Sequence, residues 1–405
     1  MTPCLPRVLI VGGPDIDARI HLMHGLSPAF EVIAIGSDPI LASKFSAAGF
    51  PYRHYTLSRQ VAPISDLRTV AQLVRIFRSL KPDIIHTFDT KPGLCGCLAA
   101  LLAKVPIIIT TITGLGGSLS GNPGFRTRVA WWIYERLQTF TCWVSDLTIF
   151  QNHDVARQFI SARVVSSSKS TVILGSGVPT HLFDPSQFSQ HERDELKQEL
   201  GIAPGELVVT MISRLIRSKG IMEFSRAARE IGTCFPKVRF LLVGPADLDS
   251  IDQPSPNELR ELREAVNWIG PRKDVGALLA ISDLFVLPTA YREGIPRVLM
   301  EAAAMALPIV TTDSAGCREV VQDRVNGLLV PLRDAAALTR AILRLLQQPE
   351  LRRRLGQAAQ RQAVERFDLS IVVNQTRSVY EQLMRERLLS PRGGATTREC
   401  GAAKA

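Results

Sequence analysis

Two glutamates with seven residues between them, Glu293 and Glu301, are the side chains in this sequence that most clearly suggest chemistry. An apolar run at 283–287 ends at Pro288 shortly before them, and Pro296 lies between them, where proline suits the first turn of a helix. The spacing predicts that Glu293 lies in a loop and Glu301 in a helix that begins near Pro296. A helix start attracts phosphate, and carboxylates accept hydrogen bonds from sugar hydroxyls. The same spacing also fits a loop charge and a solvated helix residue.

A second pair of charged side chains, Arg214 and Lys219, follows an apolar run at 207–212. Arginine presents a planar fork of donors to phosphate oxygens and lysine presents a compact cation. Because both stand where a predicted strand leads into a helix, we expect them to contact a phosphorylated ligand, although solvated loop charges fit the same pattern. The sequence has no G-x-x-x-x-G-K-[ST] motif, which argues against an ATP-hydrolysing P-loop.

Short apolar runs alternate with helix-like segments along most of the chain, a pattern typical of parallel, doubly wound α/β sheets. One series runs from 8–11 to about 171–174 and a second begins at 207–212, with a Gly, Ser and Pro-rich boundary between them. We therefore predict two doubly wound, Rossmann-like domains that face each other across a cleft. The predicted divisions are a first domain at 1–178, a second at 179–370, a helix at 371–390 that packs back toward the first domain, and a disordered tail at 391–405.

Ligands of such sheets bind beyond the carboxyl ends of the strands, and three predicted strand ends of the first domain carry suggestive residues. Gly12 and Gly13 form a turn where the backbone can approach a ligand. His86 ends another strand, where it fits either a ligand contact or a hydrogen-bonded histidine at the edge of the core. The glycine-rich stretch 113–117 follows a third strand and also fits a flexible loop.

The composition is that of a globular protein, with 405 residues, 46% apolar and 21% charged, and a formal net charge of +10. This charge suggests an acidic partner, either nucleic acid, an anionic membrane surface or a phosphorylated substrate, without choosing among them. The seven cysteines show no metal-ligand spacing and suggest reduced thiols of a cytoplasmic protein. No apolar stretch is long enough to span a bilayer, so any membrane contact should be peripheral.

Five blocks of the sequence, in order, resemble the retaining glycosyltransferases of family 4, which have the two-domain GT-B fold. The resemblance extends from about residue 7 to residue 388, and it is closest to the subgroup that builds capsule, O-antigen and related surface glycans. The blocks are PDIIHTFDTKPGLCGCLAALLAKVP, TITGLGGSL, ILGSGVPTHLFDP, REGIPRVLMEA and GCREVVQDRVNGLLVP.

The resemblance implies roles for single residues. Arg214 and Lys219 would neutralise the donor diphosphate. Glu301 would hold the ribose hydroxyls, and Glu293 those of the transferred sugar. Backbone N–H groups between Gly294 and Arg297 would take further phosphate oxygens, and the stretch from Asn267 to Gly270 would line the base site. The full set of expected donor contacts is Gly12, Gly13, Arg214, Lys219, Asn267, Ile269, Glu293, Gly294, Ile295, Pro296, Arg297 and Glu301.

This chain departs from the family pattern at a few positions. Thr113 stands where members often have histidine, which leaves His86 as the expected acceptor-side histidine. The expected catalytic set is therefore Glu293, Arg214, Lys219 and His86. Ala306 replaces a frequent glycine.

The resemblance implies transfer of a sugar, with retention of configuration, from a nucleotide-sugar to a glycan acceptor. A UDP-sugar is favoured over a GDP-sugar, and the expected acceptor is an undecaprenyl-diphosphate-linked sugar. Acceptor attack from the face that the nucleotide leaves would require neither a metal nor another cofactor, and no nucleic acid partner is expected. Two alternatives remain, a sugar-nucleotide 2-epimerase on the same fold and a catalytically silent partner subunit.

The segment 126–136 mixes arginines with Trp131, Trp132 and Tyr134 on a helical pattern, as helices at a membrane surface do. It fits equally well a helix that packs its tryptophans into the first domain. In the first case the protein would be cytoplasmic and would bind peripherally to an anionic membrane surface, at the cytoplasmic face of the inner membrane.

Overall fold

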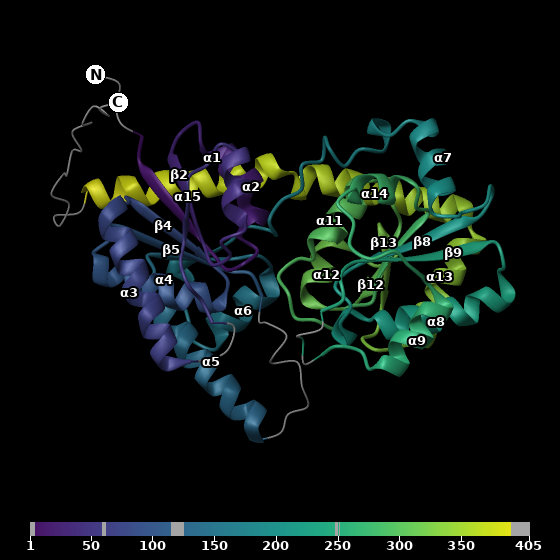
Figure 1. Cartoon of the computed structure of the whole chain (residues 1–405), viewed down its shortest axis with the longest axis horizontal. Helices are drawn as coiled ribbons and strands as arrows, with labels where there is room; N and C mark the ends of the chain where they lie inside the picture. The colour runs from purple at the N-terminus through teal and green to yellow at the C-terminus, as the bar shows by residue number, and fades with distance from the viewer. Residues whose placement is uncertain (1–4, 59–61, 115–124, 248–249, 251, 390–405) are drawn as a thin grey trace. The chain divides into compact units, whose positions relative to one another are not determined.

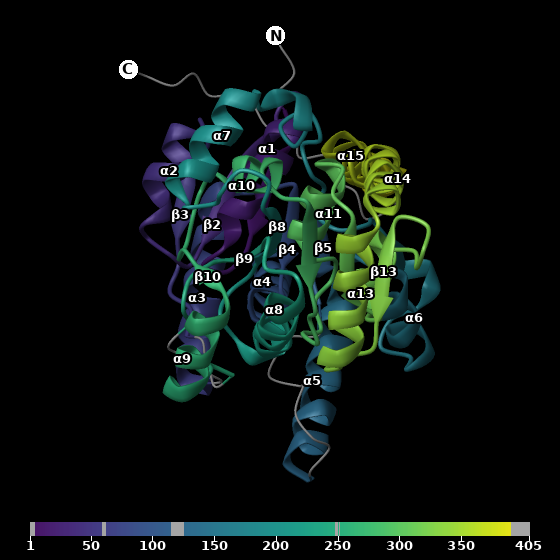
Figure 2. The same ribbon diagram turned by 90° about the vertical axis from the view of Figure 1, so that its right-hand side faces the viewer.

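The computed structural model describes residues 5–58, 62–114, 125–247, 250 and 252–389, and for residues 125–131 it describes the backbone alone. The described residues form two compact units. Unit 1 contains the residues up to 114, residues 125–173 and the residues from Ser370 onward, and unit 2 contains Leu174–Leu369. Each unit is a parallel sheet covered by helices, as Figures 1 and 2 show.

The sheet of unit 1 has seven strands among the described residues, in the order β3-β2-β1-β4-β5-β6-β7, and all of its neighbours pair in parallel. The order reverses between β1 and β4, which makes their carboxyl ends the expected place for a ligand. The strands are β1 (Arg7–Val11), β2 (Glu31–Gly36), β3 (Tyr52–His54), β4 (Ile84–Phe88), β5 (Ile107–Ile112), β6 (Leu147–Phe150) and β7 (Ser170–Val172).

Helices cover this sheet because nearly every residue of the central strands is buried, on both faces, and most of these residues are apolar. Helices α3, α4 and α5 pack in a row, and α15, the C-terminal helix, lies beside α1 (Figure 1). The helices are α1 (Ile20–Leu26), α2 (Leu41–Ala47), α3 (Pro63–Leu80), α4 (Thr90–Ala103), α5 (Phe125–Val144), α6 (His153–Ser161) and α15 (Leu369–Leu389).

The sheet of unit 2 has six strands in the described ranges, in the order β10-β9-β8-β11-β12-β13, again all parallel. Its order reverses between β8 and β11, so the loops that follow these two strands meet at the carboxyl edge. The strands are β8 (Leu207–Ile212), β9 (Val238–Val243), β10 (Asn267–Trp268), β11 (Leu284–Leu287), β12 (Ile309–Thr312) and β13 (Gly327–Val330).

The helices of unit 2 bury the apolar side chains of this sheet in a large core and in a smaller one that includes side chains of α7 and α10. Helix α8 packs beside both α9 and α13 (Figure 2), and α11 packs against α12 and α14. The helices are α7 (Gln190–Glu199), α8 (Ile221–Cys234), α9 (Pro256–Ala265), α10 (Val275–Ala280), α11 (Arg297–Ala304), α12 (Ala315–Val320), α13 (Ala335–Gln347) and α14 (Pro349–Phe367).

The predicted alternation of strands and helices is confirmed, with differences at several boundaries. The division between units falls between Ile173 and Leu174, where the sequence predicted 178/179, and Ser370 is already in unit 1. Helix α5 continues to Val144, beyond the predicted segment. Within the described residues, no helix is both long and apolar enough to cross a membrane. The predicted disordered tail at 391–405 and most of the glycine-rich stretch 113–117 lie outside these residues.

Candidate active site

The loops after β8 and β11 bring Lys219 and Glu293 together at the carboxyl edge of the unit 2 sheet. Lys219 Nζ lies 2.5 Å from Glu293 Oε1. Lys219 ends a short 3-10 helix and is only 9% exposed, whereas Glu293 is half-buried in the loop before α11. A lysine is rarely buried to this degree unless it is paired, so the carboxylate of Glu293 compensates much of its desolvation.

Arg214, in the same loop as Lys219, pairs with a different carboxylate. Its Nη1 lies 2.6 Å from Asp247 Oδ2, in the loop that follows β9. The ring of Tyr291 lies near both cations, with its centroid 5.9 Å from the Arg214 guanidinium carbon and 5.0 Å from Lys219 Nζ. Three loops thus contribute to one charged group, in which the ring face of Tyr291 attracts both cations without neutralising them.

Glu301 is buried in α11 rather than solvated, so the alternative that it is a solvated helix residue is wrong. It is 8% exposed, and its Oε1 accepts a hydrogen bond of 2.8 Å from Arg297 Nε, one helical turn earlier. Burial raises the pKa of the Glu301 carboxyl, and the charge and hydrogen bond of Arg297 only partly oppose this shift. A buried carboxylate with one cationic neighbour is well placed to hold hydroxyl groups.

The helix that carries Glu301 begins one residue later than the sequence predicted. Pro296 is its N-cap residue and Arg297 its first helical residue, and no side chain caps the N-terminus. Ile295 precedes this start, and no described group accepts a hydrogen bond from its backbone N–H. The loop and helix placements predicted for Glu293 and Glu301 are confirmed.

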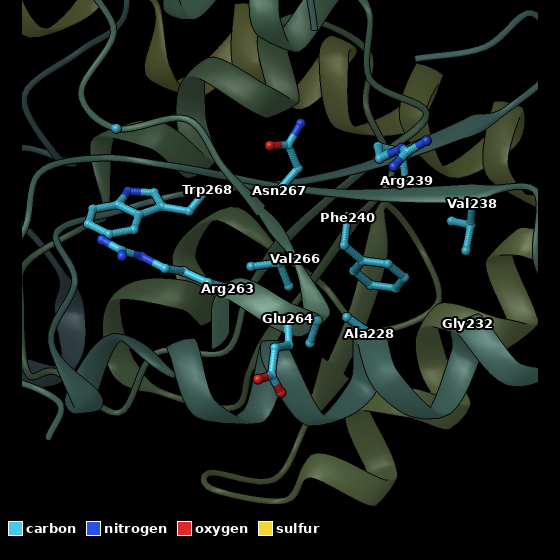
Figure 3. Close-up of a pocket in the computed structure, with 12 residues that line it drawn as sticks. Ala228, Gly232, Val238, Arg239, Phe240, Arg263, Glu264, Val266, Asn267 and Trp268 are labelled. Carbon is cyan, nitrogen blue, oxygen red and sulfur yellow. The ribbon is translucent and has the colours of Figure 1, made fainter. Parts of the chain in front are cut away.

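Asn267 and Ile269 lie on and just after the edge strand β10. The side chain of Asn267 donates to the Leu200 carbonyl at 3.5 Å. Asn267 also borders a cavity of about 740 Å³ between α8, α9 and the sheet edge, in which Arg263 lies 5.0 Å from the centroid of the Trp268 ring (Figure 3). None of Arg214, Lys219, Glu293 and Glu301 lines this cavity. That Asn267 and Ile269 line a base site therefore stays a prediction.

His86 is not placed to touch an acceptor. It is 2% exposed, and its Nδ1 and Nε2 lie 2.6 Å from Tyr380 Oη and Thr111 Oγ1, so both ring nitrogens have partners inside unit 1. Burial, and secondarily the charge of Arg19, lower the pKa of His86 to about 3. The expected catalytic role of His86 is corrected on this geometry, because a neutral, enclosed and fully bonded imidazole ties strand β4 to helix α15.

Gly12 and Gly13 lie at the carboxyl end of β1 in unit 1. The N–H of Gly12 donates to the Ile35 carbonyl at 3.0 Å, and its carbonyl accepts from Tyr55 Oη at 2.9 Å. Both backbone groups of Gly12 are thus used within the unit, and the expected contact of these glycines with the donor stays a prediction.

The hydroxyl of Thr113 donates a hydrogen bond to the carboxylate of Asp89. Asp89 follows β4 with φ at 69°, a conformation that non-glycine residues adopt rarely. Within the described ranges, no group of three or more His, Cys, Asp and Glu side chains is arranged to hold a metal ion.

The sequence missed three residues that contact the charged group of unit 2. Asp247 holds Arg214, Tyr291 lies near both cations, and Gly316 packs on the loop of Glu293. Each stands close to a predicted strand end, which is the one signal that could have drawn attention to them.

Comparison with sequence families gives two matches that follow one another along the chain. A family described as Glycosyl transferase 4-like domain matches residues 21–174, and one described as Glycosyl transferases group 1 matches residues 192–362. The second match includes all of the charged group of unit 2.

Several characterised proteins are similar over most of their length. An N,N'-diacetylbacillosaminyl-diphospho-undecaprenol alpha-1,3-N-acetylgalactosaminyltransferase of Campylobacter jejuni is 28% identical, over 88% of this chain and 92% of its own. A UDP-Gal:alpha-D-GlcNAc-diphosphoundecaprenol alpha-1,3-galactosyltransferase of Escherichia coli is 27% identical, over 72% and 73%. The capsular polysaccharide biosynthesis glycosyltransferase CapM of Staphylococcus aureus is 26% identical, over 82% and 84%.

Solved structures agree on the fold. HepE from Anabaena, crystallised in complex with UDP, superimposes with a TM-score of 0.76 at 21% identity, covering 93% of this chain and 100% of that one. WaaG, a glycosyltransferase involved in lipopolysaccharide biosynthesis, gives a TM-score of 0.70 at 15% identity, covering 92% and 99%. The paired Rossmann-like units, the two family matches and these relatives together show that the chain is a glycosyltransferase of family 4 with the GT-B fold.

Proposed function

We propose that this glycosyltransferase moves a sugar, with retention of configuration, from a UDP-sugar to an undecaprenyl-diphosphate-linked sugar in the synthesis of a surface polysaccharide. The names of the Campylobacter and Escherichia relatives support the acceptor class, since both refer to a diphospho-undecaprenol. The name of the Escherichia relative also supports a UDP-sugar, and that of CapM supports capsule synthesis.

One observation carries this proposal, the convergence of Arg214 and Lys219 with Glu293 on the loops that flank the β8/β11 reversal. As a glycosyl bond breaks, negative charge grows on the departing diphosphate and positive character grows on the sugar. The two cations stabilise the first and the carboxylate the second, and stabilisation that is stronger in the transition state than in the ground state accelerates transfer.

The ion pairs in this structure indicate how the charged side chains exchange partners when the donor binds. Arg214 is held by Asp247 and Lys219 by Glu293. The diphosphate, with more charge than either carboxylate, competes for both cations, and the sugar hydroxyls then take the carboxylate oxygens of Glu293. Glu301, buried one turn inside α11, takes the ribose hydroxyls in place of its bond from Arg297.

Retention and independence of metal are further parts of the proposal, and the two cations beside Glu293 support the second. Two side-chain cations at the diphosphate supply the charge stabilisation that a divalent metal supplies in other transferases. The departing phosphate oxygen accepts the proton of the acceptor hydroxyl, which attacks the face that the phosphate leaves. No protein base is required in this scheme, in agreement with the enclosed position of His86.

Helix α5 supports peripheral binding to an anionic membrane, because its burial is the reverse of the usual pattern. It buries Gln138 and Thr141 beside Cys142, while Trp132 is 59% exposed and Trp143 is 69% exposed. These tryptophans are eleven residues apart, which is about three helical turns, so they share one face. Arg136 lies 5.7 Å from the centroid of the Trp132 ring on that face. Tryptophan beside arginine is typical of a helix that lies in the headgroup layer.

A donor screen tests the proposal. The purified protein is incubated with a panel of UDP-sugars and GDP-sugars, with EDTA present, and nucleotide release and thermal stabilisation are measured. A double variant, Arg214→Ala with Lys219→Ala, is the matched control. We expect one UDP-sugar to give both signals in the native protein and neither in the variant, and the product with a prenyl-diphosphate-sugar acceptor to keep the anomeric configuration of the donor.

Three results of this screen would contradict the proposal. They are an absolute requirement for a divalent metal, inversion at the anomeric carbon, and conversion of a UDP-sugar to its C2 epimer without acceptor, which would indicate an epimerase.

A further inference from the structure

Three glycines allow neighbouring segments to pack closely at the carboxyl edge of the unit 2 sheet. In each case the Cα of a glycine packs directly on a backbone carbonyl of the next loop. The contacts are Gly244 on Ser213, Gly220 on Pro288 and Gly316 on Gly294. Each contact is adjacent in sequence to a charged residue of the site: Ser213 to Arg214, Gly220 to Lys219 and Gly294 to Glu293.

The contact of Gly316 is the closest to Glu293. A Cβ on Gly316 would lie 1.9 Å from the Gly294 carbonyl oxygen and 3.3 Å from that of Glu293. Both carbonyls therefore lie against the first turn of α12, and only a hydrogen atom fits between the Cα of Gly316 and the nearer oxygen. Any side chain would move either the helix or the loop.

This packing also sets the direction of two backbone donors. In a trans peptide the N–H of one residue points opposite to the carbonyl of the residue before it, and the chain has no cis peptide bond among the described residues. Because the carbonyls of Glu293 and Gly294 lie against α12, the N–H groups of Gly294 and Ile295 point away from that helix.

Strand β12 adds a second tie to the loop that carries Glu293. The hydroxyl of Thr312, the last residue of β12, donates to the carbonyl of Thr289, at the start of the loop that carries Glu293. Thr312 is buried, so this bond is shielded from water. The loop is thus held at its beginning by β12 and at Gly294 by α12.

We propose that Gly316 is a positioning residue of the donor site, which acts by holding the loop of Glu293 against α12. In this position Glu293 reaches Lys219. The identity of the ligand as a nucleotide-sugar rests on the proposed function, whereas the role of Gly316 in holding the loop does not.

Gly316 allows a cleaner test than the other two glycines. Gly220 has φ at 83° and Gly244 at 142°, so a side chain at either would add backbone strain to the collision. Gly316 has no left-handed φ, and it lies in the first turn of helix α12, where alanine is a better helix former than glycine. Any loss in Gly316→Ala therefore comes from the collision with the loop.

The test compares Gly316→Ala with Gly232→Ala. Gly232 is also helical, in α8, and a Cβ there meets no atom within 4 Å. Two measurements are made on each protein: UDP affinity by titration calorimetry, and amide hydrogen exchange of the peptide that covers 289–296, without nucleotide. We expect Gly316→Ala to weaken UDP binding tenfold or more and to accelerate exchange of that peptide at least fivefold, while Gly232→Ala stays within twofold in both.

The two measurements separate the inference from the proposed function. If exchange in a folded Gly316→Ala stays within twofold, the positioning role is wrong, whatever UDP does. If exchange accelerates but the native protein binds neither UDP nor GDP, the proposed function fails and the positioning role stands. If exchange accelerates but UDP affinity stays within twofold, the loop is held by Gly316 without serving the donor, and the inference is overturned.

Should Gly316→Ala not fold, Thr312→Val takes its place. Valine keeps the shape of threonine and removes only the bond to the Thr289 carbonyl. We then expect exchange of the same peptide to accelerate at least threefold and UDP affinity to fall at least threefold, and no change in either would contradict the inference.

Discussion

Lys219 Nζ and Glu293 Oε1 lie 2.5 Å apart although 74 positions separate them in the sequence. They meet because β8 and β11 are neighbours at the reversal of the unit 2 sheet, so that the loops after both strands emerge at one edge. Under the proposed function, Lys219 binds the diphosphate and Glu293 the transferred sugar, so the pair would lie beside the sugar–phosphate bond that is broken.

The exposed face of α5 can be tested with lipid vesicles. Replacing Trp132 and Trp143 by serine should reduce cosedimentation with anionic vesicles at least fivefold, because tryptophan favours the interfacial layer. The melting temperature and UDP affinity should be unchanged, since both side chains are exposed. Val364→Ser, which removes an exposed apolar side chain of α14 in unit 2, is the control. A drop in melting temperature with vesicle binding intact would instead favour a packing role.

The bond between His86 and Tyr380 should matter for stability and not for chemistry. Tyr380→Phe leaves Nδ1 of the buried imidazole without its partner, which costs about 1–3 kcal/mol. The melting temperature should fall clearly in Tyr380→Phe and less in Tyr52→Phe. The native Tyr52 is half-buried and its hydroxyl donates to the Asp38 carbonyl. The rate of sugar transfer per folded molecule should stay within twofold of that of the native protein. A large fall in that rate at full folding would restore a catalytic role for His86.

Ala306 occupies a position that favours glycine. It follows α11 with φ at 55°, and the N–H of Leu307 bonds the Ala302 carbonyl, the arrangement in which helices commonly end with a left-handed glycine. We expect Ala306→Gly to stabilise the protein by about 1 kcal/mol, because a left-handed residue with a Cβ costs about that much. Ala303→Gly, inside the same helix, should destabilise it. Thermal unfolding of the two variants is the measurement, and a lowered midpoint in Ala306→Gly would contradict the strain argument.

These cases show what the sequence could predict and what it could not. Apolar periodicity and the position of Pro296 were sufficient to place Glu293 in a loop and Glu301 in a helix, because both depend on local patterns. The partners of the site residues could not be read in this way. Arg214 pairs with Asp247, which lies 33 positions later, and His86 bonds Tyr380, which lies 294 positions later. Both contacts depend on packing between elements.

Short elements were missed for a related reason. Strand β3, Tyr52–His54, is three residues long, lies at the sheet edge and has no apolar run. Its strand conformation therefore depends on hydrogen bonding to β2 more than on its own composition. The burial of Glu301 likewise depends on the packing of α11 against α12 and α14, which no local pattern contains.

Burial of Glu301 gives a pH dependence with a definite sign. The folded protein holds the Glu301 proton to a higher pH than the unfolded chain does, so the stability contributed by its neutral form is lost as the pH rises through the raised pKa. Glu301→Gln cannot ionise, so its melting temperature relative to the native protein should increase between pH 4.5 and pH 7.5. Glu350→Gln, at an exposed position, corrects for the loss of one charge. A relative melting temperature of Glu301→Gln that falls over this range would contradict the assigned direction.

The division of labour between the two glutamates is the centre of this account, and one side-by-side measurement tests it. Nucleoside diphosphate affinity and transfer rate are determined for Glu293→Gln and Glu301→Gln. Glu301→Gln should weaken bare UDP about tenfold, because the ribose is part of that ligand. Glu293→Gln should leave UDP affinity within twofold and lower the transfer rate at least a hundredfold, because a carboxylate beside a sugar of growing positive character acts mainly in the transition state. Equal weakening of bare UDP by both variants, or an unchanged transfer rate in Glu293→Gln, would contradict it.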